Sequence, residues 1–255
     1  MPRYFLEVAY KGTEFSGFQI QDNANSVQTE IEKAFGIYFR RTIDMTGSSR
    51  TDAGVHALKN FFHFDFAASI DHNALYHINA ILPADIVCRG LYEVDGNDHC
   101  RFDALSRRYE YRIHRRKDPF LRDRSYYYPY ALNTADMKEA ALMVLRHNDF
   151  TSFSKRNTQT KTFNCQVKMS RWTESGETYV FEVEANRFLR GMVRGLVGTM
   201  LQVGRGKIDV RGFESVLLAK DNTKADFSVP GHGLFLVNVE YPEGMLKAVS
   251  QDEES

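Results

Sequence analysis

The stretch Gly47-Ser48-Ser49-Arg50-Thr51-Asp52-Ala53-Gly54-Val55-His56-Ala57 separates segments with clear helix and strand patterns and has neither pattern itself. Its small residues allow the backbone to approach a ligand closely. Arg50 and Asp52 place one cation and one carboxylate two positions apart on what we expect to be an exposed loop. An Arg-x-Asp sequence alone is most often a polar turn with a local ion pair. The stretch is therefore a candidate functional site, and the surrounding sequence must decide between a functional site and an ordinary polar turn.

Predicted strands and helices alternate on both sides of this stretch. Apolar residues at helical spacing predict a helix over residues 27–38, with Ser26 as its N-cap. A second helical stripe over residues 188–200 predicts a long helix with Asn186 as its N-cap. The other predicted elements are strands over residues 4–10, 62–66, 86–94, 108–116, 162–171, 179–185 and 233–241, and helices over residues 71–81 and 134–147.

This alternation predicts a mixed α/β or α+β chain. The length of 255 residues suits one large domain or two small ones, and we expect a division near residues 100–107. The expected N-terminal lobe spans residues 1–105 and carries the Asp52 loop. The expected C-terminal lobe spans residues 106–245, and residues 246–255 are expected to form a frayed polar tail.

The composition restricts the classes of protein to consider. The chain has 33 basic and 33 acidic residues, so its overall charge does not indicate a polyanionic partner. Three cysteines without a Cys-x-x-Cys pair argue against disulfides and a zinc site, and His99-Cys100 has no further ligands at the usual spacing. We predict no metal and no cofactor, because the sequence also lacks phosphate-loop and dinucleotide fingerprints. It shows no signal peptide or long apolar run, so we expect a cytoplasmic protein without membrane contact.

The segment Arg50-Thr51-Asp52-Ala53-Gly54-Val55-His56-Ala57 resembles the signature of the tRNA pseudouridine synthase A family, in which the aspartate is catalytic. Further resemblances cover most of residues 4–241. They lie at Tyr10, Gly12, Thr13, Gly17 and Gln19, and at Ser26-Val27-Gln28, Asn79-Ala80-Ile81-Leu82-Pro83, Arg101-Phe102-Asp103-Ala104, Arg107-Arg108-Tyr109-Glu110-Tyr111, Asp149-Phe150-Thr151-Ser152-Phe153, Asn186-Arg187-Phe188-Leu189-Arg190-Gly191-Met192-Val193-Arg194 and Gly233-Leu234-Phe235-Leu236.

This resemblance implies a pseudouridine synthase fold, with two similar lobes of mixed, largely antiparallel sheets flanked by helices around a central cleft. It also implies a homodimer that isomerises uridine to pseudouridine in tRNA, in the anticodon stem-loop at positions 38 to 40. Asp52 is the expected nucleophile, and Arg50 is expected to favour its ionised form or to fill the space of an extruded base. The expected substrate-binding residues are Tyr109, Leu234 and Arg194, and the expected RNA-binding residues are Arg107, Arg108, Arg115, Arg116 and Arg190.

Positive charge gathers in two parts of this neutral chain. Residues 101–124 contain nine Arg and Lys against four Asp and Glu, and Tyr126-Tyr127-Tyr128 follow directly. Residues 187–211 contain six Arg and Lys against one Asp. Basic runs are more often solvated faces than binding sites, but cations beside aromatic rings suit phosphate contact and base stacking. Since both runs adjoin the motifs that resemble the family, they favour an RNA-binding surface.

Some positions depart from the family pattern. Lys11, Phe18, Ser49 and Gly191 stand where the family usually has Asp, Trp, Gly and His. These departures leave open a paralogous synthase that acts on another RNA. A protein that binds structured RNA without chemistry is a second alternative, and a hydrolase that cleaves N-glycosidic bonds and releases free uracil is a third. The sequence also leaves open whether Asp52 attacks uracil C6, attacks ribose C1′ or assists proton loss at C2′.

Overall fold

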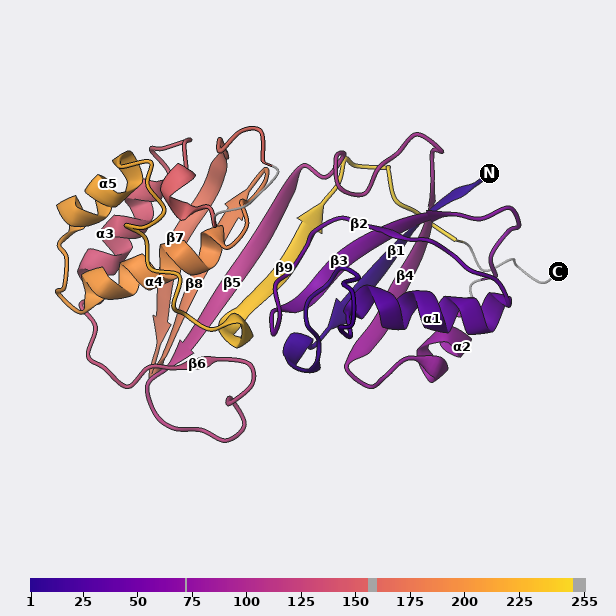
Figure 1. Cartoon of the computed structure of the whole chain (residues 1–255), viewed down its shortest axis with the longest axis horizontal. Helices are drawn as coiled ribbons and strands as arrows, with labels where there is room; N and C mark the ends of the chain where they lie inside the picture. Colours follow the sequence, from indigo (N-terminus) through magenta and orange to yellow (C-terminus); the bar gives the residue numbers. More distant parts are fainter. Residues whose placement is uncertain (72, 156–159, 250–255) are drawn as a thin grey trace. The chain divides into compact units, whose positions relative to one another are not determined.

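The computed structural model describes residues 1–71, 73–155 and 160–249 and divides the chain into two compact units (Figure 1). The first unit comprises Met1–Leu105 and the chain from Leu236 onward, and the second comprises Ser106–Phe235. The expected C-terminal lobe, residues 106–245, therefore extends beyond the end of the second unit. Lys247–Ala248 forms a short strand within the expected tail, and residues 250–255 lie outside the described part of the chain.

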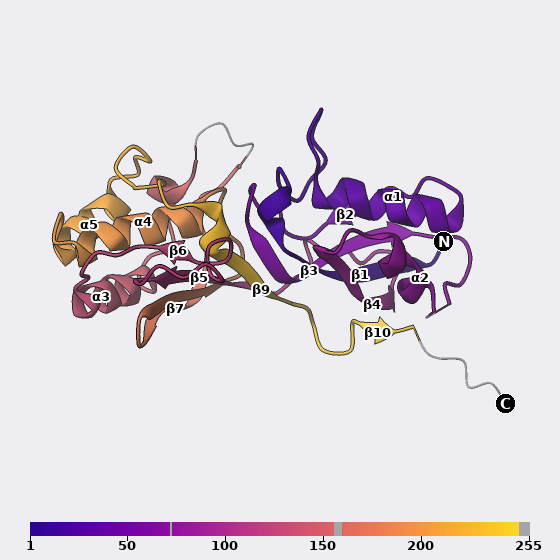
Figure 2. The ribbon, with the colours of Figure 1, turned by 90° about the horizontal axis from the view of Figure 1, so that it is seen from below.

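The first unit is built on an antiparallel sheet with strand order β10-β4-β1-β3, and β2 pairs with β3. Helix α1 runs across one face of this sheet (Figure 2). The ring of Phe35 on α1 packs edge-on against Phe64 on β3, with ring centres 5.4 Å apart. The elements of this unit are β1 (Arg3–Tyr10), η1 (Gly12–Glu14), α1 (Val27–Phe39), β2 (Thr46–Gly47), β3 (His56–Asp65), α2 (Ala74–Ile81), β4 (Ile86–Val94) and β10 (Lys247–Ala248).

Local signals explain both helices of the first unit. The Ser26 hydroxyl accepts a hydrogen bond from the Thr29 backbone N–H, which confirms the predicted N-cap of α1. Helix α2 begins at Ala74 rather than at the predicted Asp71, because the Asp71 carboxylate accepts from the Asn73 N–H and forms a turn there. The side chain of Asn79 then joins α2 to β4 by bonding both the N–H and the carbonyl of Cys88.

The second unit contains the antiparallel order β5-β8-β7, and β6 pairs with β5 in parallel. Helix α3 packs against β7, and α3, α4 and α5 contact one another. Its elements are β5 (Ser106–His114), β6 (Tyr126–Tyr127), α3 (Thr134–Val144), η2 (Thr151–Phe153), β7 (Val167–Ser175), β8 (Thr178–Ala185), α4 (Met192–Gly204), α5 (Val210–Leu218) and η3 (Gly231–Gly233), and β9 (Leu234–Glu240) leads from this unit into the first.

The start of α4 differs from the sequence prediction. Asn186 does not cap it, because its side chain accepts from the Gln166 N–H while its own N–H donates to the Gln166 carbonyl. The N-cap is Gly191, whose φ of 75° favours glycine. Helix α5, which the sequence analysis did not predict, begins where Asp209 accepts from the Gly212 N–H. The mixed α/β class is nevertheless confirmed, and no helix among the described residues is long and apolar enough to cross a membrane.

Candidate active site and RNA-binding surface

The Asp52 loop is a tight turn between β2 and β3. The Asp52 carbonyl accepts a hydrogen bond from the Val55 N–H at 3.2 Å, and Gly54 takes a φ of 75° inside this turn. Asp52 is half-buried, whereas Arg50 is exposed. The Arg50 side chain makes no hydrogen bond or ion pair with another residue of the described chain, so the local ion pair of an ordinary Arg-x-Asp turn does not form.

The segment between β1 and α1 holds this loop through backbone hydrogen bonds. The Phe18 N–H donates to the Thr51 carbonyl at 3.1 Å, and the Gly54 N–H donates to the Phe15 carbonyl at 3.4 Å. The Gly12 N–H donates to Nδ1 of buried His56 at 3.0 Å. His56 thus has a structural role in this turn. These bonds fix both ends of the loop to the same segment.

Glycines bring this segment close enough to hold the loop. A Cβ on Gly12 would overlap the Val55 carbonyl, and one on Gly47 would overlap the ring of Phe18. Gly17 lies close to the Thr51 carbonyl with a φ of 126°, which a side chain rarely allows. The Phe18 ring also stacks on Phe62 with centres 4.5 Å apart. The Gly-Thr…Gly pattern noted in the sequence therefore shapes the Asp52 loop from outside it.

A buried polar network holds the residues on either side of Arg50. The hydroxyl groups of Tyr10 and Thr51 lie 2.8 Å apart, and Asn60 Nδ2 donates to the Ser49 carbonyl at 2.9 Å. Asn60 Nδ2 also lies 3.3 Å from the Tyr10 hydroxyl. The sequence analysis missed Asn60. Its position beside Phe61 and Phe62 was a signal, because an amide buried among apolar residues needs a hydrogen-bond partner, here the backbone of the neighbouring loop.

One departure from the family pattern, Ser49, places an unfavourable buried hydroxyl beside the Asp52 loop. Ser49 stands where the family usually has glycine, and its hydroxyl is buried without a hydrogen-bond partner among the described residues. A buried hydroxyl without a partner is unfavourable. Its backbone carbonyl still accepts from Asn60, so the loop keeps that anchor.

The expected substrate-binding residues Tyr109, Leu234 and Arg194 all belong to the second unit. Tyr109 lies on β5, is buried, and packs edge-on against Phe188 with ring centres 5.0 Å apart. Leu234 is buried at the start of β9. These placements fit ordinary core packing as well as the base contact implied by the resemblance, and the base contact stays a prediction.

Arg194 on α4 is held in place, unlike a solvated helix residue. Its Nε donates to the Val229 carbonyl at 2.8 Å, and its Nη2 lies 3.4 Å from the Phe227 carbonyl. Nearby, the Tyr111 hydroxyl donates to the Pro230 carbonyl at 2.8 Å. Burial raises the pKa of Tyr111, so this phenol stays neutral and keeps its donor proton. Two buried or half-buried side chains thus fix the segment that leads to Leu234.

The five expected RNA-binding arginines have different surroundings. Arg107 is buried, and its guanidinium donates to the Asn186 carbonyl at 2.9 Å, which fits a positioning role better than contact with RNA. Arg108 and Arg115 are half-buried, and each has a buried Nε without a hydrogen-bond partner in the described chain. Arg190 is exposed, and the side chain of Arg116 is 82 % exposed beside Glu177.

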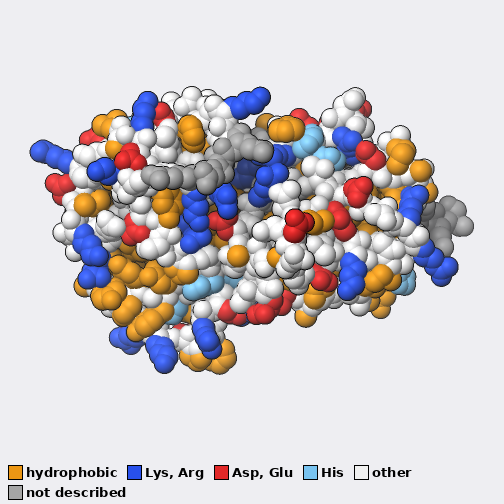
Figure 3. Space-filling model, in the orientation of Figure 1, with side chains coloured by type: hydrophobic (Ala, Val, Ile, Leu, Met, Phe, Trp, Pro, Cys, Tyr) orange, Lys and Arg blue, Asp and Glu red, His pale blue; other side chains and the backbone are white. Residues whose placement is uncertain are grey.

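The basic loop, which we define as residues 115–125, joins β5 to β6. It is the most accessible part of the first basic run. Figure 3 shows Lys and Arg side chains over this loop with hydrophobic atoms beside them. Phe120 is 82 % exposed, which is unusual for a large apolar residue. The exposed basic residues around it are Arg116, Lys117, Arg122 and Arg124.

Comparisons with known proteins agree with one another over most of the chain. A family model described as tRNA pseudouridine synthase matches residues 140–242. The tRNA pseudouridine synthase A of Parabacteroides distasonis is 45% identical over 245 residues, which cover 95% of this chain and 97% of that protein. The protein of the same name from Bacteroides thetaiotaomicron is 45% identical over a match that covers 95% of this chain and 92% of that protein. The tRNA pseudouridine synthase A of Bacillus subtilis is 37% identical over a match that covers 92% of this chain and 97% of that protein.

Proposed function

Because this chain belongs to the tRNA pseudouridine synthase A family, we propose that it converts uridine to pseudouridine in tRNA. The reaction is an isomerisation. The bond between ribose C1′ and uracil N1 breaks, the base turns, and C1′ bonds to C5. C5 then loses its proton while N1 gains one, so no oxidant, reductant or water is consumed.

The single observation that carries this proposal is the construction of the Asp52 loop. Backbone hydrogen bonds and close glycine contacts hold the turn, so the backbone that carries the Asp52 carboxylate is fixed in position. A nucleophile needs such positioning relative to its substrate. The exposed Arg50 lies two residues away and has no hydrogen-bond or ion-pair partner among the described residues. We assign Asp52 as the catalytic carboxylate, and Arg50 as the cation that favours its ionised form or replaces the extruded base.

Residues of the second unit complete the proposal. We assign Tyr109, Leu234 and Arg194 to binding of the target uridine, with Tyr109 stacking on or hydrogen-bonding the base. Arg108, Arg115, Arg116 and Arg190 supply cations for the RNA backbone.

Three finer proposals concern the setting of the reaction. The target uridines lie in the anticodon stem-loop at tRNA positions 38 to 40. The protein works as a homodimer, which doubles the basic surface available to one tRNA. It acts in the cytoplasm on its tRNA substrate. The family resemblance supports all three.

Tritium release from tRNA labelled at uracil C5 tests the function directly. The wild-type chain should release tritium, and Asp52→Asn should lower the rate by about 1,000-fold or more, because it removes the nucleophile while keeping the shape. Asp44→Asn is the matched control, since Asp44 is exposed and lies outside the loop. Transcripts with cytidine at position 38, 39 or 40 identify the target.

Each alternative predicts a different outcome of this assay. Tight tRNA binding without release would favour a binding protein or another RNA substrate. Free uracil among the products would favour the N-glycosidic hydrolase. Near-normal release by Asp52→Asn would remove Asp52 from the nucleophile role.

A further inference from the structure

We propose that His63, His99 and Cys100 bind one zinc ion. His63 lies on β3, and His99-Cys100 lies on the stretch that follows β4. One ligand atom from each residue lies within 4.8 Å of the other two. His63 Nδ1 is 3.2 Å from Cys100 Sγ, and the two imidazole rings meet nearly edge to face with centres 4.5 Å apart. Folding thus supplies the ligand that the sequence lacked beside His99-Cys100.

The ligand set and its spacing suit Zn²⁺. Zinc in proteins prefers imidazole nitrogen at about 2.0–2.1 Å and thiolate sulfur at about 2.3 Å. In a tetrahedral site these bond lengths separate neighbouring ligand atoms by roughly 3.3–3.7 Å. The thiol–imidazole separation of 3.2 Å is already near this value, and no separation within the cluster exceeds 4.8 Å. Binding displaces the Cys100 thiol proton to solvent, and a water molecule takes the fourth position.

Hydrogen bonds already orient the residues around this cluster. The Cys100 carbonyl accepts from the Tyr241 hydroxyl at 2.5 Å, a bond that does not depend on the Cys100 thiol proton. The His99 N–H donates to the Asp103 carboxylate at 2.6 Å. Surrounding bonds of this kind hold metal ligands in position.

The charges around the cluster tolerate a dication. Half-buried Arg3 is a cation of the same unit, but its guanidinium is paired with Asp65 through bonds of 2.7 and 2.8 Å. Two further carboxylates, Asp98 and Asp103, flank His99-Cys100 in the chain. The remaining neighbour in sequence, Arg101, is exposed. Acidic groups therefore offset the positive charge that a bound ion adds.

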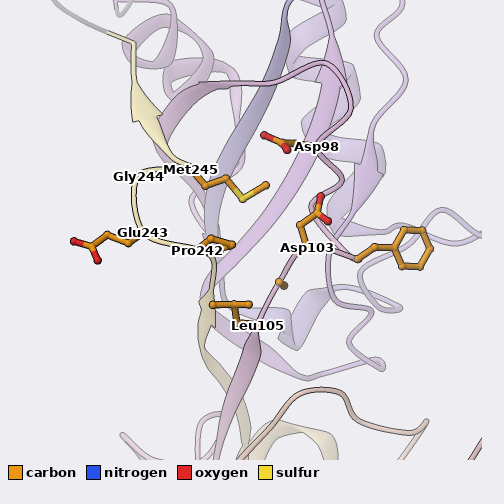
Figure 4. A pocket seen from close by; sticks show the side chains of 9 residues that line it. Asp98, Asp103, Leu105, Pro242, Glu243, Gly244 and Met245 are labelled. Atoms are coloured by element: carbon orange, nitrogen blue, oxygen red, sulfur yellow. The ribbon is translucent and has the colours of Figure 1, made fainter.

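An open groove of about 670 Å³ lies beside the His99-Cys100 stretch and is lined by Asp98 and Asp103, the carboxylates on either side of it. Figure 4 shows Asp98 and Asp103 on one wall and Pro242 and Met245 on the other, with Glu243 turned outward. Carboxylates at the mouth of a site attract a hydrated cation before it reaches its ligands.

The proposed zinc would stabilise the fold rather than take part in the reaction. It would join β3 to the stretch after β4, and the Cys100 thiol contacts Thr46 in β2, directly before the Asp52 loop. The Tyr241 hydroxyl that binds the Cys100 carbonyl also contacts the Ser48 hydroxyl at 3.3 Å. The ion would therefore strengthen the base of that loop. This inference is independent of the proposed function.

Titration with Co²⁺, a coloured substitute for Zn²⁺, tests the site in the reduced, tag-free full chain. We expect one equivalent to give a thiolate-to-cobalt charge-transfer band, and Zn²⁺ to abolish it by competition. Cys100→Ser should lose the band, while Cys88→Ser should keep it, since Cys88 is a buried cysteine outside the cluster. His99→Gln changes a half-buried side chain and should weaken Co²⁺ binding by roughly tenfold or more.

Two results would overturn the proposal. One is the absence of the band in the wild-type chain, which needs no variant to fold. The other is a band of unchanged intensity and affinity in Cys100→Ser. Zn²⁺ should also raise the melting temperature of the wild-type chain but leave that of Cys100→Ser unchanged, because only a folded site binds the ion.

Discussion

The Asp52 loop and the basic loop carry different parts of the proposed activity, and they are built in opposite ways. The Asp52 loop is fixed by backbone hydrogen bonds, close glycine contacts and a buried polar network. The basic loop contains short turns, from Leu121 to Asp118 and from Arg124 to Leu121, and its cations other than Arg115 are exposed. Chemistry on a base needs a fixed geometry, whereas contact with phosphates needs charge that reaches the RNA.

This difference predicts how the two loops respond to substitution. Steric changes should damage the Asp52 loop and spare RNA affinity. Loss of charge from the basic loop should weaken RNA affinity and spare folding. The variants below test that separation.

Among these variants, which keep Asp52 itself, Gly12→Ala should have the largest effect. Its new Cβ would overlap the Val55 carbonyl, so the backbone of the loop must move. We expect a loss of about 2–3 kcal/mol in unfolding free energy. A displacement of about 1 Å also costs about 100-fold in turnover. Chemical denaturation and single-turnover assays measure the two effects.

Gly36→Ala is the control for this substitution. Gly36 lies inside α1, and its new Cβ would meet only the Arg41 carbonyl at an ordinary 3.6 Å. Alanine should stabilise that helix by up to about 1 kcal/mol without changing turnover. If Gly12→Ala instead matched Gly36→Ala in both measurements, close packing at Gly12 would not hold the loop.

Tyr10→Phe should have an intermediate effect, and we expect it to slow turnover as well as lower the free energy of unfolding. It removes the Tyr10 hydroxyl, which contacts both the Thr51 hydroxyl and the Asn60 side-chain amide. The expected loss in unfolding free energy is about 1 kcal/mol. We expect turnover to fall by about tenfold, because Thr51 directly precedes Asp52. Tyr92→Phe removes a hydroxyl bonded to Glu7 in the same unit, and it should leave turnover unchanged. Equal turnover in both variants would contradict the role of the network.

The sequence predicted those features that depend on neighbouring residues. Helix α1 and its Ser26 cap follow from spacing within one segment, and Asp52 follows from an eight-residue motif. The supports of the Asp52 loop depend on distant residues instead, since Tyr10 and Thr51 are 41 positions apart. His63 on β3 and Cys100 on the stretch after β4 are 37 positions apart and meet only in the folded unit. Neither contact leaves a periodic pattern that a single sequence reveals.

The same limit explains the errors at element boundaries. Strand β7 begins at Val167 rather than near residue 162, because Asn164 and Cys165 bond the backbone at Asp149 and Asn148 instead. Asn186 resembled a helix cap, yet its side chain bonds the backbone N–H of Gln166. In both cases a polar backbone group found a partner far away in the sequence, which local propensity does not predict.

The double variant Arg116→Gln with Arg122→Gln should have the smallest effect on the protein itself and a clear effect on its RNA binding. Both arginines are exposed, and the pair of Arg116 with Glu177 spans 3.4 Å at the surface, so stability should change by less than about 0.5 kcal/mol. If both contact phosphates, the salt dependence of tRNA affinity should fall by about 0.7–0.9 per arginine. Lys33→Gln with Lys138→Gln removes the same charge from exposed helix positions and should leave that slope unchanged. An equal fall in both double variants would assign the effect to net charge, and the basic loop would lose its separate role in binding RNA.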